Sequence, residues 1–297
     1  MISIIICSID PVLLAAVKEN ISATIGIPFE IIATDNRNST KGICEVYNDS
    51  VAYARYELLC FVHEDIVIST QDWGKTLVRL FKDPKLGLVG VAGSNYRPLT
   101  PSAWAGIGPK TVYQNIIQAH KFKKADDALH YLNPKKEKLA KVACVDGVWL
   151  TTTKTIASAI KFDQDTFKGF HVYDVDFSMS VAQSYTVAVT FEILIKHLSE
   201  GRYDQAWMAD NLKFSEKWHS KLPLSVGEHA PELLMSGEKS TFKHFIEQLI
   251  QFGFPMQVAY NVLWRNNQFF NSYGKLFFKL NYYIFIKYVL KRRRNMA

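Results

Sequence analysis

The chain has 297 residues, of which 48% are hydrophobic and 21% are charged, and its formal net charge is +7. This composition is that of a globular protein and excludes a long disordered chain, and the length fits one large domain or a domain with an appendage. Seven of the 35 Lys and Arg residues lie in residues 275–297, which hold no Asp or Glu. The remaining 274 residues therefore carry a net charge close to zero, and no nucleic-acid partner is expected.

The first ninety residues alternate between strand-like and helix-like segments. Continuous β-branched or apolar runs predict strands, and apolar residues at helical spacing predict helices between them. The predicted strands are 2–8, 29–35, 58–65 and 86–93, and the predicted helices are 11–24, 41–56 and 71–82. This alternation predicts an α/β fold with a parallel sheet and right-handed crossovers, in which ligands bind at the carboxyl ends of the strands.

The later part of the chain has a less regular pattern. In the region of residues 94–140, the Gly-, Pro- and Ser-rich stretch at 93–110 predicts a long loop, which often has a functional role, and the Lys-rich stretch at 121–138 predicts a solvated, charged excursion. The segments predicted after it are a strand at 141–154, a loop leading into a short helix at 167–184, a long strand at 185–201, and helices at 202–220, 240–252 and 256–290. Placing the boundary at residues 221–223, we expect a catalytic domain at 1–220 and a helical C-terminal extension at 221–297.

Two adjacent carboxylates, Glu64 and Asp65, end the third predicted strand. Side chains at that position enter the crevice, where two carboxylates would repel each other and lose hydration unless a cation neutralised them. Mg²⁺ or Mn²⁺ prefers oxygen ligands and commonly bridges to substrate phosphates. The alternative is one solvated carboxylate and one helix cap.

A second pair of carboxylates, Asp174 and Asp176, lies near a predicted helix start. Simple capping accounts for such residues, because the exposed N–H groups of a helix start favour carboxylates. The functional alternative is a general base that faces an acceptor hydroxyl. Residues two apart on a helix point about 200° away from each other, so only one of the two can face the crevice.

Two further residues lie at predicted strand ends. His197 is either a structural histidine or a third metal ligand with a neutral ring nitrogen. Asp35 either accepts from a nucleobase N–H or is a turn aspartate before "NRNS". The chain has no G-x-G-x-x-G after its first strand, no Walker A sequence and no G-x-S-x-G, which argues against dinucleotide, P-loop and serine-hydrolase sites.

The cysteines and the hydropathy favour a cytoplasmic protein. None of the four cysteines forms a C-x-x-C pair, and Cys7 and Cys60 lie in apolar runs that suit buried reduced thiols. The first ten residues lack the basic region of a signal peptide, and no stretch of 18 uncharged apolar residues predicts a membrane-spanning helix. We therefore expect a cytoplasmic chain, with peripheral attachment to the inner face of the membrane as an option.

A set of short motifs occurs in order along the chain: "SIIICSID", "EIIATDN", "ICEVYN", "LLCFVHEDI", "DWGKTL", "GVAGS", "VDGVWL", "FKGFHVYDVDFS" and "HLSEG". Over roughly residues 1–220 this set resembles the bacterial glycosyltransferases of GT-A fold related to family 2, in particular the subgroup described as glycosyltransferase-like. The resemblance implies a Rossmann-like, mostly parallel sheet flanked by helices. It also implies a nucleotide-diphospho-sugar donor, expected to be a UDP-sugar, a divalent Mn²⁺ or Mg²⁺, and inverting transfer to a saccharide or lipid-linked acceptor.

The resemblance implies ligands for the metal and the donor. The family's acidic metal motif falls on "HED", where Asp65 matches the last acid, His63 replaces the usual first Asp and Glu64 stands in for it. His197 falls where some members keep a further ligand. The residues implied to contact the nucleotide-sugar are Cys7, Ser8, Asp10, Asp35, Asn48 and Glu64.

The same resemblance places the catalytic base in "YDVD". It implies Asp174 as the base, with Asp176 as the second choice. Trp104 is a candidate to stack on a sugar face, with an ordinary core position as the alternative.

Two rival functions stay open. The replacement at His63 is compatible with a catalytically inactive sugar-nucleotide-binding or scaffold protein. A sugar-phosphate nucleotidyltransferase is expected to carry a Gly-rich basic loop after the first strand, which "CSIDPVLLAAV" does not offer.

The aromatic, basic residues 275–297 suit an interfacial helix on anionic lipid, or else a C-terminal helix packed on the domain or a dimer contact.

Overall fold

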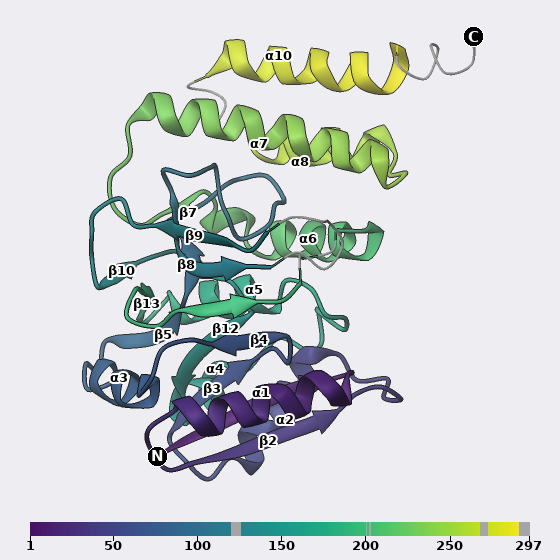
Figure 1. The fold of residues 1–297 in the computed structure, drawn as a ribbon. Helices are drawn as coiled ribbons and strands as arrows, with labels where there is room; N and C mark the ends of the chain where they lie inside the picture. The colour runs from purple at the N-terminus through teal and green to yellow at the C-terminus, as the bar shows by residue number, and fades with distance from the viewer. Residues whose placement is uncertain (120–125, 200, 202, 268–272, 291–297) are drawn as a thin grey trace.

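The centre of the computed structural model is a seven-stranded sheet (Figure 1). In spatial order its strands are β10 (Leu139–Lys141), β13 (Thr186–Thr190), β5 (Leu86–Gly90), β12 (Trp149–Thr153), β3 (Leu58–Val62), β1 (Ile2–Ser8) and β2 (Phe29–Asp35). β10 and β12 run antiparallel to their neighbours, and the others run in one direction. The predicted mostly parallel sheet is confirmed. The structure describes residues 1–119, 126–199, 201, 203–267 and 273–290.

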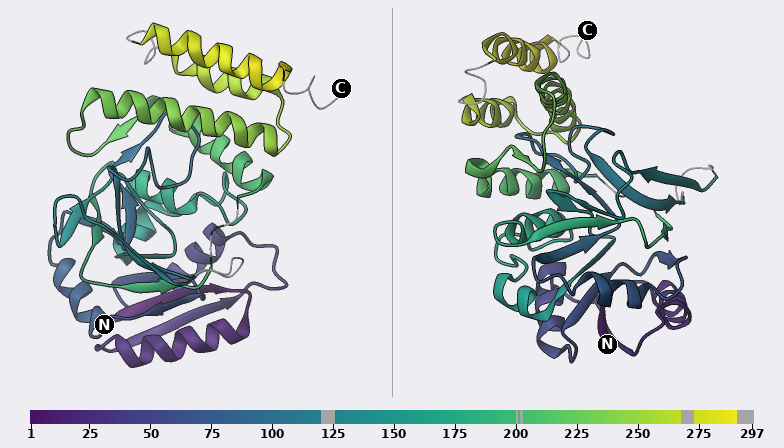
Figure 2. Two further views of the ribbon diagram at one scale, coloured as in Figure 1. Left: turned by 45° about the horizontal axis from the view of Figure 1, so that its top comes forward. Right: turned by 90° about the vertical axis from the view of Figure 1, so that its left-hand side faces the viewer.

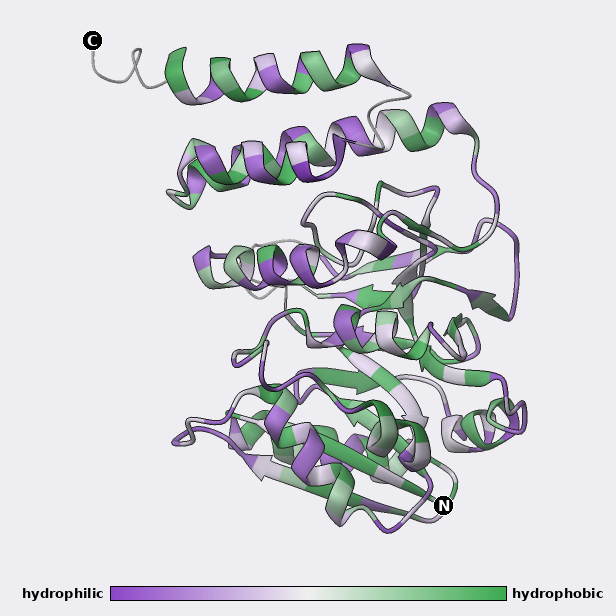
Figure 3. Ribbon diagram, turned by 180° about the vertical axis from the view of Figure 1, so that it is seen from behind, coloured by the Kyte–Doolittle hydropathy of each residue, from purple (hydrophilic) through white to green (hydrophobic). Residues whose placement is uncertain are grey.

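Helices cover both faces of this sheet. α1 (Pro11–Thr24) and α3 (Trp73–Leu80) pack on one face, and α2 (Ile43–Tyr53), α4 (Lys154–Ile160) and α5 (Tyr173–Val181) pack on the other. Because side chains alternate along a strand, Ile4 and Ile6 join the apolar cluster with α1 and α3, whereas Ile5 joins the cluster with α2, α4 and α5. Burial on both faces explains why five of the seven residues of β1 are apolar. In Figure 3 the strands are largely hydrophobic, whereas hydrophobic and hydrophilic residues alternate along the helices α7 and α10.

A second sheet lies beside the first. Its order is β11 (Cys144–Val145), β6 (Ala92–Ser94), β8 (Val112–Gln118), β14 (Ile195–His197) and β4 (Ile66–Ile68), with β9 (Ala128–Leu132) paired to β8. The strands predicted at 58–65, 86–93, 141–154 and 185–201 are wrong in extent. In each of these four runs a strand stops at a turn or break, and the next strand along the chain belongs to the other sheet.

The sequence pattern hid these breaks because the strands on both sides of each turn are apolar and mostly buried. The predicted long loop is confirmed for residues 98–111, but the charged stretch after it contains β9, and β8 between the two stretches was not predicted. The stretch "VYQNIIQ" of β8 mixes apolar with amide side chains and therefore does not show a clear strand period. The short helix α4 was not predicted.

The C-terminal part of the chain is helical. The elements are α6 (Gln205–Lys217), a 3-10 turn (His219–Lys221), α7 (Pro231–Gln251), α8 (Met256–Arg265) and α10 (Gly274–Phe285), which a π-helical turn (Ile286–Leu290) extends. A short strand, β15 (Leu224–Ser225), pairs with β7 (Tyr96–Arg97). α7, α8 and α10 share an apolar cluster and form a layer at the opposite end of the molecule from α1 (Figures 1 and 2).

The helix predictions in this part are confirmed in kind and corrected in extent. The predicted helix 240–252 begins earlier, at Pro231, a residue type favoured in the first turn of a helix. The predicted helix 256–290 is wrong as a single element, because α8 ends at Arg265 and α10 begins at Gly274; residues 268–272 lie outside the described part. Within the described residues, no helix is both long enough and apolar enough to cross a membrane. The division at residue 220 stays a prediction.

Candidate active site

A cleft of about 810 Å³ opens at the carboxyl ends of β1 and β3, beside the second sheet. The ionisable carboxylates and imidazoles that line it are Asp10, Glu64, Asp65, Asp146, Asp174, His63, His130, His171 and His197. Its larger aromatic side chains are Trp104, Phe170, Tyr173, Tyr203 and Trp207. None of the described lining residues is a Lys or Arg. The five carboxylates of this lining would repel a polyanionic ligand unless a cation were bound beside them.

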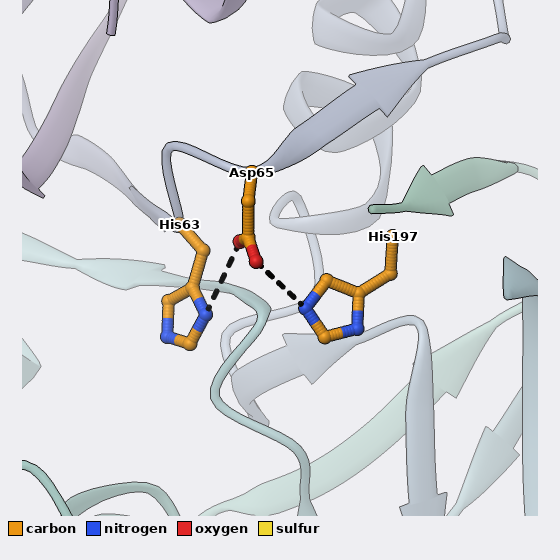
Figure 4. A group of neighbouring side chains, drawn as sticks. All are labelled: His63, Asp65 and His197. Atoms are coloured by element: carbon orange, nitrogen blue, oxygen red, sulfur yellow. Dashed lines mark ion pairs between the residues drawn. The ribbon is translucent and has the colours of Figure 1, made fainter. Parts of the chain in front are cut away.

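One group of side chains in the cleft has the spacing of a metal site (Figure 4). His63 and Asp65 lie in the turn between β3 and β4, and His197 ends β14, which pairs antiparallel with β4 so that His197 is opposite Ile66. The Asp65 carboxylate lies 3.9 Å from Nδ1 of His63 and 3.4 Å from Nε2 of His197. One ligand atom from each residue lies within 4.8 Å of the others. The strand pairing thus brings together residues far apart in the sequence.

The charges of this group suit a cation. Burial by itself would raise the pKa of Asp65, but His197, His63 and the Ser199 hydroxyl together hold it well below its usual range. Ser199 Oγ donates to Asp65 Oδ2 at 2.5 Å. Burial lowers the pKa of His63, which keeps this ring neutral near pH 7. An ionised carboxylate beside a neutral imidazole is a donor set that a divalent metal can use.

Glu64 points to a different neighbour from Asp65. Its carboxylate accepts hydrogen bonds from Ser8 Oγ at 2.5 Å and from the backbone N–H groups of Ile9 and Asp10, each at 3.1 Å. It therefore ties the end of β3 to the loop between β1 and α1 and does not join the His63, Asp65 and His197 group. Its predicted role as a metal ligand is not supported by this placement, and the repulsion expected between the two carboxylates is relieved by their divergence.

Asp174 and Asp176 face opposite sides of α5, as their spacing predicts. Asp174 lines the cleft, and its Oδ2 accepts a hydrogen bond from Gly147 N at 2.9 Å. Burial, together with the negative charge of Asp146, raises the pKa of Asp174 to about 7. Asp176 instead bonds Lys217 Nζ and Trp218 Nε1, outside the cleft. The structure therefore gives Asp176 a partner set typical of a structural ion pair.

The residues predicted to bind the nucleotide fall in several places. Cys7, Asp10 and Trp104 line the cleft, and Asp10 also caps α1 by accepting from Val12 N and Leu13 N. Ser8 is buried beneath Glu64, to which it donates. Cys7, Asp10 and Trp104 thus share one cleft, and their contacts with a donor stay predictions.

Two of the predicted residues are not brought to the cleft. Asp35 is exposed and paired with Arg37, whose hydrogen bonds lower the pKa of Asp35 to about 2. Asn48 holds a backbone turn by donating to Phe162 O at 2.9 Å and accepting from Phe162 N at 2.9 Å. Asn48 lines a separate cavity, on the Asp176 side of α5.

The family of the chain is decided by a comparison over most of its length. Residues 3–221 match the Glycosyltransferase like family. The chain belongs to this family. A search of curated proteins finds no significant match.

Two solved structures share the GT-A fold of this glycosyltransferase-like protein. One is the mannosyltransferase PcManGT from Pyrobaculum calidifontis, in complex with GDP-Man and Mn²⁺, with a TM-score of 0.50 at 12% identity over 90% of this chain and 75% of that one. The other is GalNAc-T7 with UDP, GalNAc and Mn²⁺, with a TM-score of 0.50 at 8% identity over 74% of this chain and 49% of that one. At these identities the likeness shows the fold.

Sequence reasoning on this glycosyltransferase-like protein did not assign His63 and Asp146 to the site. The signal for His63 was its i, i+2 spacing from Asp65, with Glu64 between them pointing elsewhere. The signal for Asp146 was the Asp-Gly pair inside the predicted strand 141–154, which indicates a turn. Neither signal shows which residues from distant parts of the sequence lie beside His63 and Asp146. Only the fold shows this.

Proposed function

We propose that this protein is a metal-assisted, inverting glycosyltransferase that uses a nucleotide-diphospho-sugar donor. The observation that carries the proposal is that the His63, Asp65 and His197 group and the Asp174 carboxylate line the same cleft. The first arrangement suits a cation beside a diphosphate, and the second suits removal of a proton from a hydroxyl. Membership of the family supports the same class of reaction.

His63, Asp65 and His197 are the residues that would hold the cation. One carboxylate with two imidazoles fits Mn²⁺ better than Mg²⁺, because imidazole nitrogen suits transition metals whereas Mg²⁺ prefers oxygen ligands. When bound, the cation supplies positive charge to the diphosphate leaving group. Since the described lining residues include no Lys or Arg, donor affinity should depend strongly on this cation.

Asp174 acts as the general base. The proton of the acceptor hydroxyl moves to the Asp174 carboxylate while the hydroxyl oxygen attacks the anomeric carbon. The bond from that carbon to the diphosphate oxygen breaks, and the nucleoside diphosphate leaves with the electron pair. A pKa of about 7 suits this role, because a base works best when its pKa lies near the working pH. Attack opposite the leaving group inverts the anomeric configuration.

The rival functions are less well supported by the site. A nucleotidyltransferase needs free donors after the first strand to hold phosphates, but the N–H groups of Ile9 and Asp10 are occupied by Glu64. The inactive scaffold rested on the replacement at His63, and this histidine lies where it can itself serve as a ligand. Both observations favour a working glycosyltransferase.

The donor, acceptor and location belong to the same proposal. We assign the donor wall to Cys7, Asp10 and Trp104 and expect a UDP-sugar there. The acceptor is a saccharide or a lipid-linked saccharide, handled at the cytoplasmic face of the membrane. The support for this location is the exposed aromatic face of α10 and the excess of basic residues at the C-terminus.

Calorimetry and a transfer assay test the proposal. UDP should bind in the presence of Mn²⁺, and chelation should abolish binding; equal affinity with chelator would contradict the metal role. Asp174→Asn should lower kcat roughly 100-fold or more while UDP affinity is kept. The matched control is Asp165→Asn, an exposed carboxylate outside the cleft, which should leave kcat unchanged. Unchanged turnover in Asp174→Asn would remove it from the base role.

A further inference from the structure

The Tyr173 hydroxyl lies between the proposed metal group and the proposed base. Tyr173 is the first residue of α5 and is buried. Its hydroxyl oxygen is 2.7 Å from Nε2 of His63 and 3.1 Å from the carbonyl oxygen of Gly147. This contact uses the nitrogen of His63 that points away from Asp65 (Figure 4).

The single proton of the hydroxyl decides how these bonds are arranged. The Gly147 carbonyl can only accept, and among the described residues Tyr173 is its one hydrogen-bond donor. A tyrosine hydroxyl carries one proton at neutral pH, and Tyr173 gives it to the Gly147 carbonyl. The remaining lone pairs of the hydroxyl then accept from Nε2–H of His63. The lone pair of His63 is left on Nδ1, the nitrogen that faces Asp65.

Gly147 also holds the proposed base. Its N–H donates to Oδ2 of Asp174 at 2.9 Å, and Asp174 is the residue that follows Tyr173 in the chain. A Cβ on Gly147 would collide with the Tyr173 hydroxyl, so only glycine permits this close approach. Gly147 is therefore linked to both parts of the site. Its N–H contacts Asp174 directly, and its carbonyl contacts the Tyr173 hydroxyl, which in turn contacts His63.

We propose that Tyr173 is a positioning residue that fixes His63 in the Nε2–H tautomer and so directs the Nδ1 lone pair to the cation. The inference rests on the proposed function for its metal, but the tautomer exists without the metal. Hydrogen bonds of this kind orient metal-binding histidines, and their loss commonly costs 10–100-fold in metal affinity, by order of magnitude. A role limited to packing is the alternative, since the ring also lies 5.7 Å from Tyr47 and 6.0 Å from Phe170.

Tyr173→Phe separates the two roles, because it keeps the ring and removes the hydroxyl. In metal-free protein in mildly alkaline buffer, ¹⁵N NMR should show His63 protonated on Nε2, with the signal assigned by its loss in His63→Gln. Tyr173→Phe should produce a mixture of tautomers. Calorimetry with Mn²⁺ alone should show affinity weakened by roughly 10–100-fold. The matched control is Tyr96→Phe, which removes another buried hydrogen-bonded hydroxyl, to Glu238 at 2.8 Å, and should leave both readouts unchanged.

Three outcomes separate this inference from the proposed function. An Nδ1–H tautomer of His63 in the wild type would overturn the inference. So would Mn²⁺ affinity and a tautomer that both stay unchanged in Tyr173→Phe. A wild type with the expected tautomer but no affinity for Mn²⁺ would instead overturn the metal in the proposed function, while supporting the assignment of His63 by Tyr173.

Discussion

At the scale of single residues, Asp174 should set the response of the enzyme to pH. A general base must be ionised, and burial with the Asp146 charge raises the pKa of Asp174 to about 7. We therefore expect kcat/KM to fall about tenfold for each pH unit below this value. Asp146→Asn keeps the oxygen that accepts from Val148 N and removes the charge, so the pKa of Asp174 should drop and the acidic limb should move to lower pH. An acidic limb at the same pH in both proteins would contradict this coupling.

The same carboxylate should lower the stability of the fold above neutral pH. A carboxyl whose pKa is raised on folding binds its proton more tightly in the folded state, so stability falls as pH rises from about 4 to about 7. Asp174→Asn retains an acceptor for Gly147 N and has no charge to bury. Its free energy of unfolding should exceed that of the wild type by on the order of 1–3 kcal/mol at alkaline pH, with the advantage disappearing in acid.

Urea unfolding at both pH values measures this difference, and Asp176→Asn is the contrasting variant. Asp176 is more deeply buried than Asp174, but it is paired with Lys217 and Trp218. Burial raises the pKa of Asp176 as well, but Lys217 and Trp218 oppose this shift, so removing the Asp176 charge should stabilise the fold at alkaline pH less than Asp174→Asn does. Equal effects of the two substitutions would show that their partners do not distinguish them.

At the scale of elements, the sequence predicted helices and strands best where the residues of a segment by themselves determine its secondary structure. The strand 2–8, the helix 11–24 and the strand 29–35 match β1, α1 and β2 to the residue. A run buried on both faces identifies β1, and Pro11, a residue type favoured in the first turn of a helix, identifies the start of α1. These signals are local, and no distant residue is needed to read them.

The site could be predicted only in part, for the opposite reason. The strand-end positions of Asp65 and His197 were visible in the sequence, and so was the opposed direction of Asp174 and Asp176. The exclusion of Glu64 from the metal group depends on the backbone of the loop between β1 and α1. The contact of His63 with Tyr173 joins residues 110 positions apart. Such contacts are fixed by tertiary packing, which a local pattern does not contain.

Helix α7 is the element that connects the C-terminal layer to the cleft wall. Glu238 of α7 is fully buried and accepts from Tyr96 Oη at 2.8 Å and from Leu99 N at 3.1 Å. Arg97, between these two residues, in turn donates to the carbonyls of Ser102 and Ala103, which line the cleft. The segment that carries Trp104 is thus supported from behind by the extension.

Glu238→Ala should therefore destabilise more than the extension. It leaves the Tyr96 hydroxyl and the Leu99 N–H buried without their acceptor, at a cost of about 2–4 kcal/mol in the free energy of unfolding. Unfolding is best measured about one pH unit or more below 7, because burial raises the pKa of Glu238 to about 7 and the carboxyl is then mostly protonated. Glu238→Gln retains an acceptor and should recover part of the loss. Glu232→Ala, at an exposed position of the same helix, is the control and should change little.

At the scale of the whole molecule, exposed aromatic side chains gather on α10, in a part of the sequence that is rich in Lys and Arg. Phe278, Tyr282 and Phe285 of α10 are 74%, 65% and 46% exposed, and their i, i+4, i+7 spacing places them on one face of the helix. α10 lies in the layer farthest from α1 (Figures 1 and 2). Residues 256–297 contain eight Lys or Arg and no Asp or Glu. An apolar face with basic surroundings is complementary to an anionic lipid surface.

This distribution predicts binding to vesicles that contain anionic lipid. Substituting Phe278, Tyr282 and Phe285 together by Ser should reduce sedimentation with anionic vesicles by about tenfold or more, because the apolar contribution to interfacial binding is lost. Added salt should weaken binding of the wild type, since each Lys or Arg near the surface contributes about 1 kcal/mol of screened attraction.

The control for this experiment is Tyr53→Ser, which removes an aromatic side chain that is 78% exposed but belongs to α2. It should bind vesicles like the wild type, and UDP binding with Mn²⁺ should be normal in both variants because neither change touches the cleft. A wild type that ignores anionic vesicles, yet changes from dimer to monomer in the triple variant, would instead make this face a contact between two copies of the chain. Retained vesicle binding in the triple variant would mean that the basic residues suffice, and α10 would lose its place in the interface.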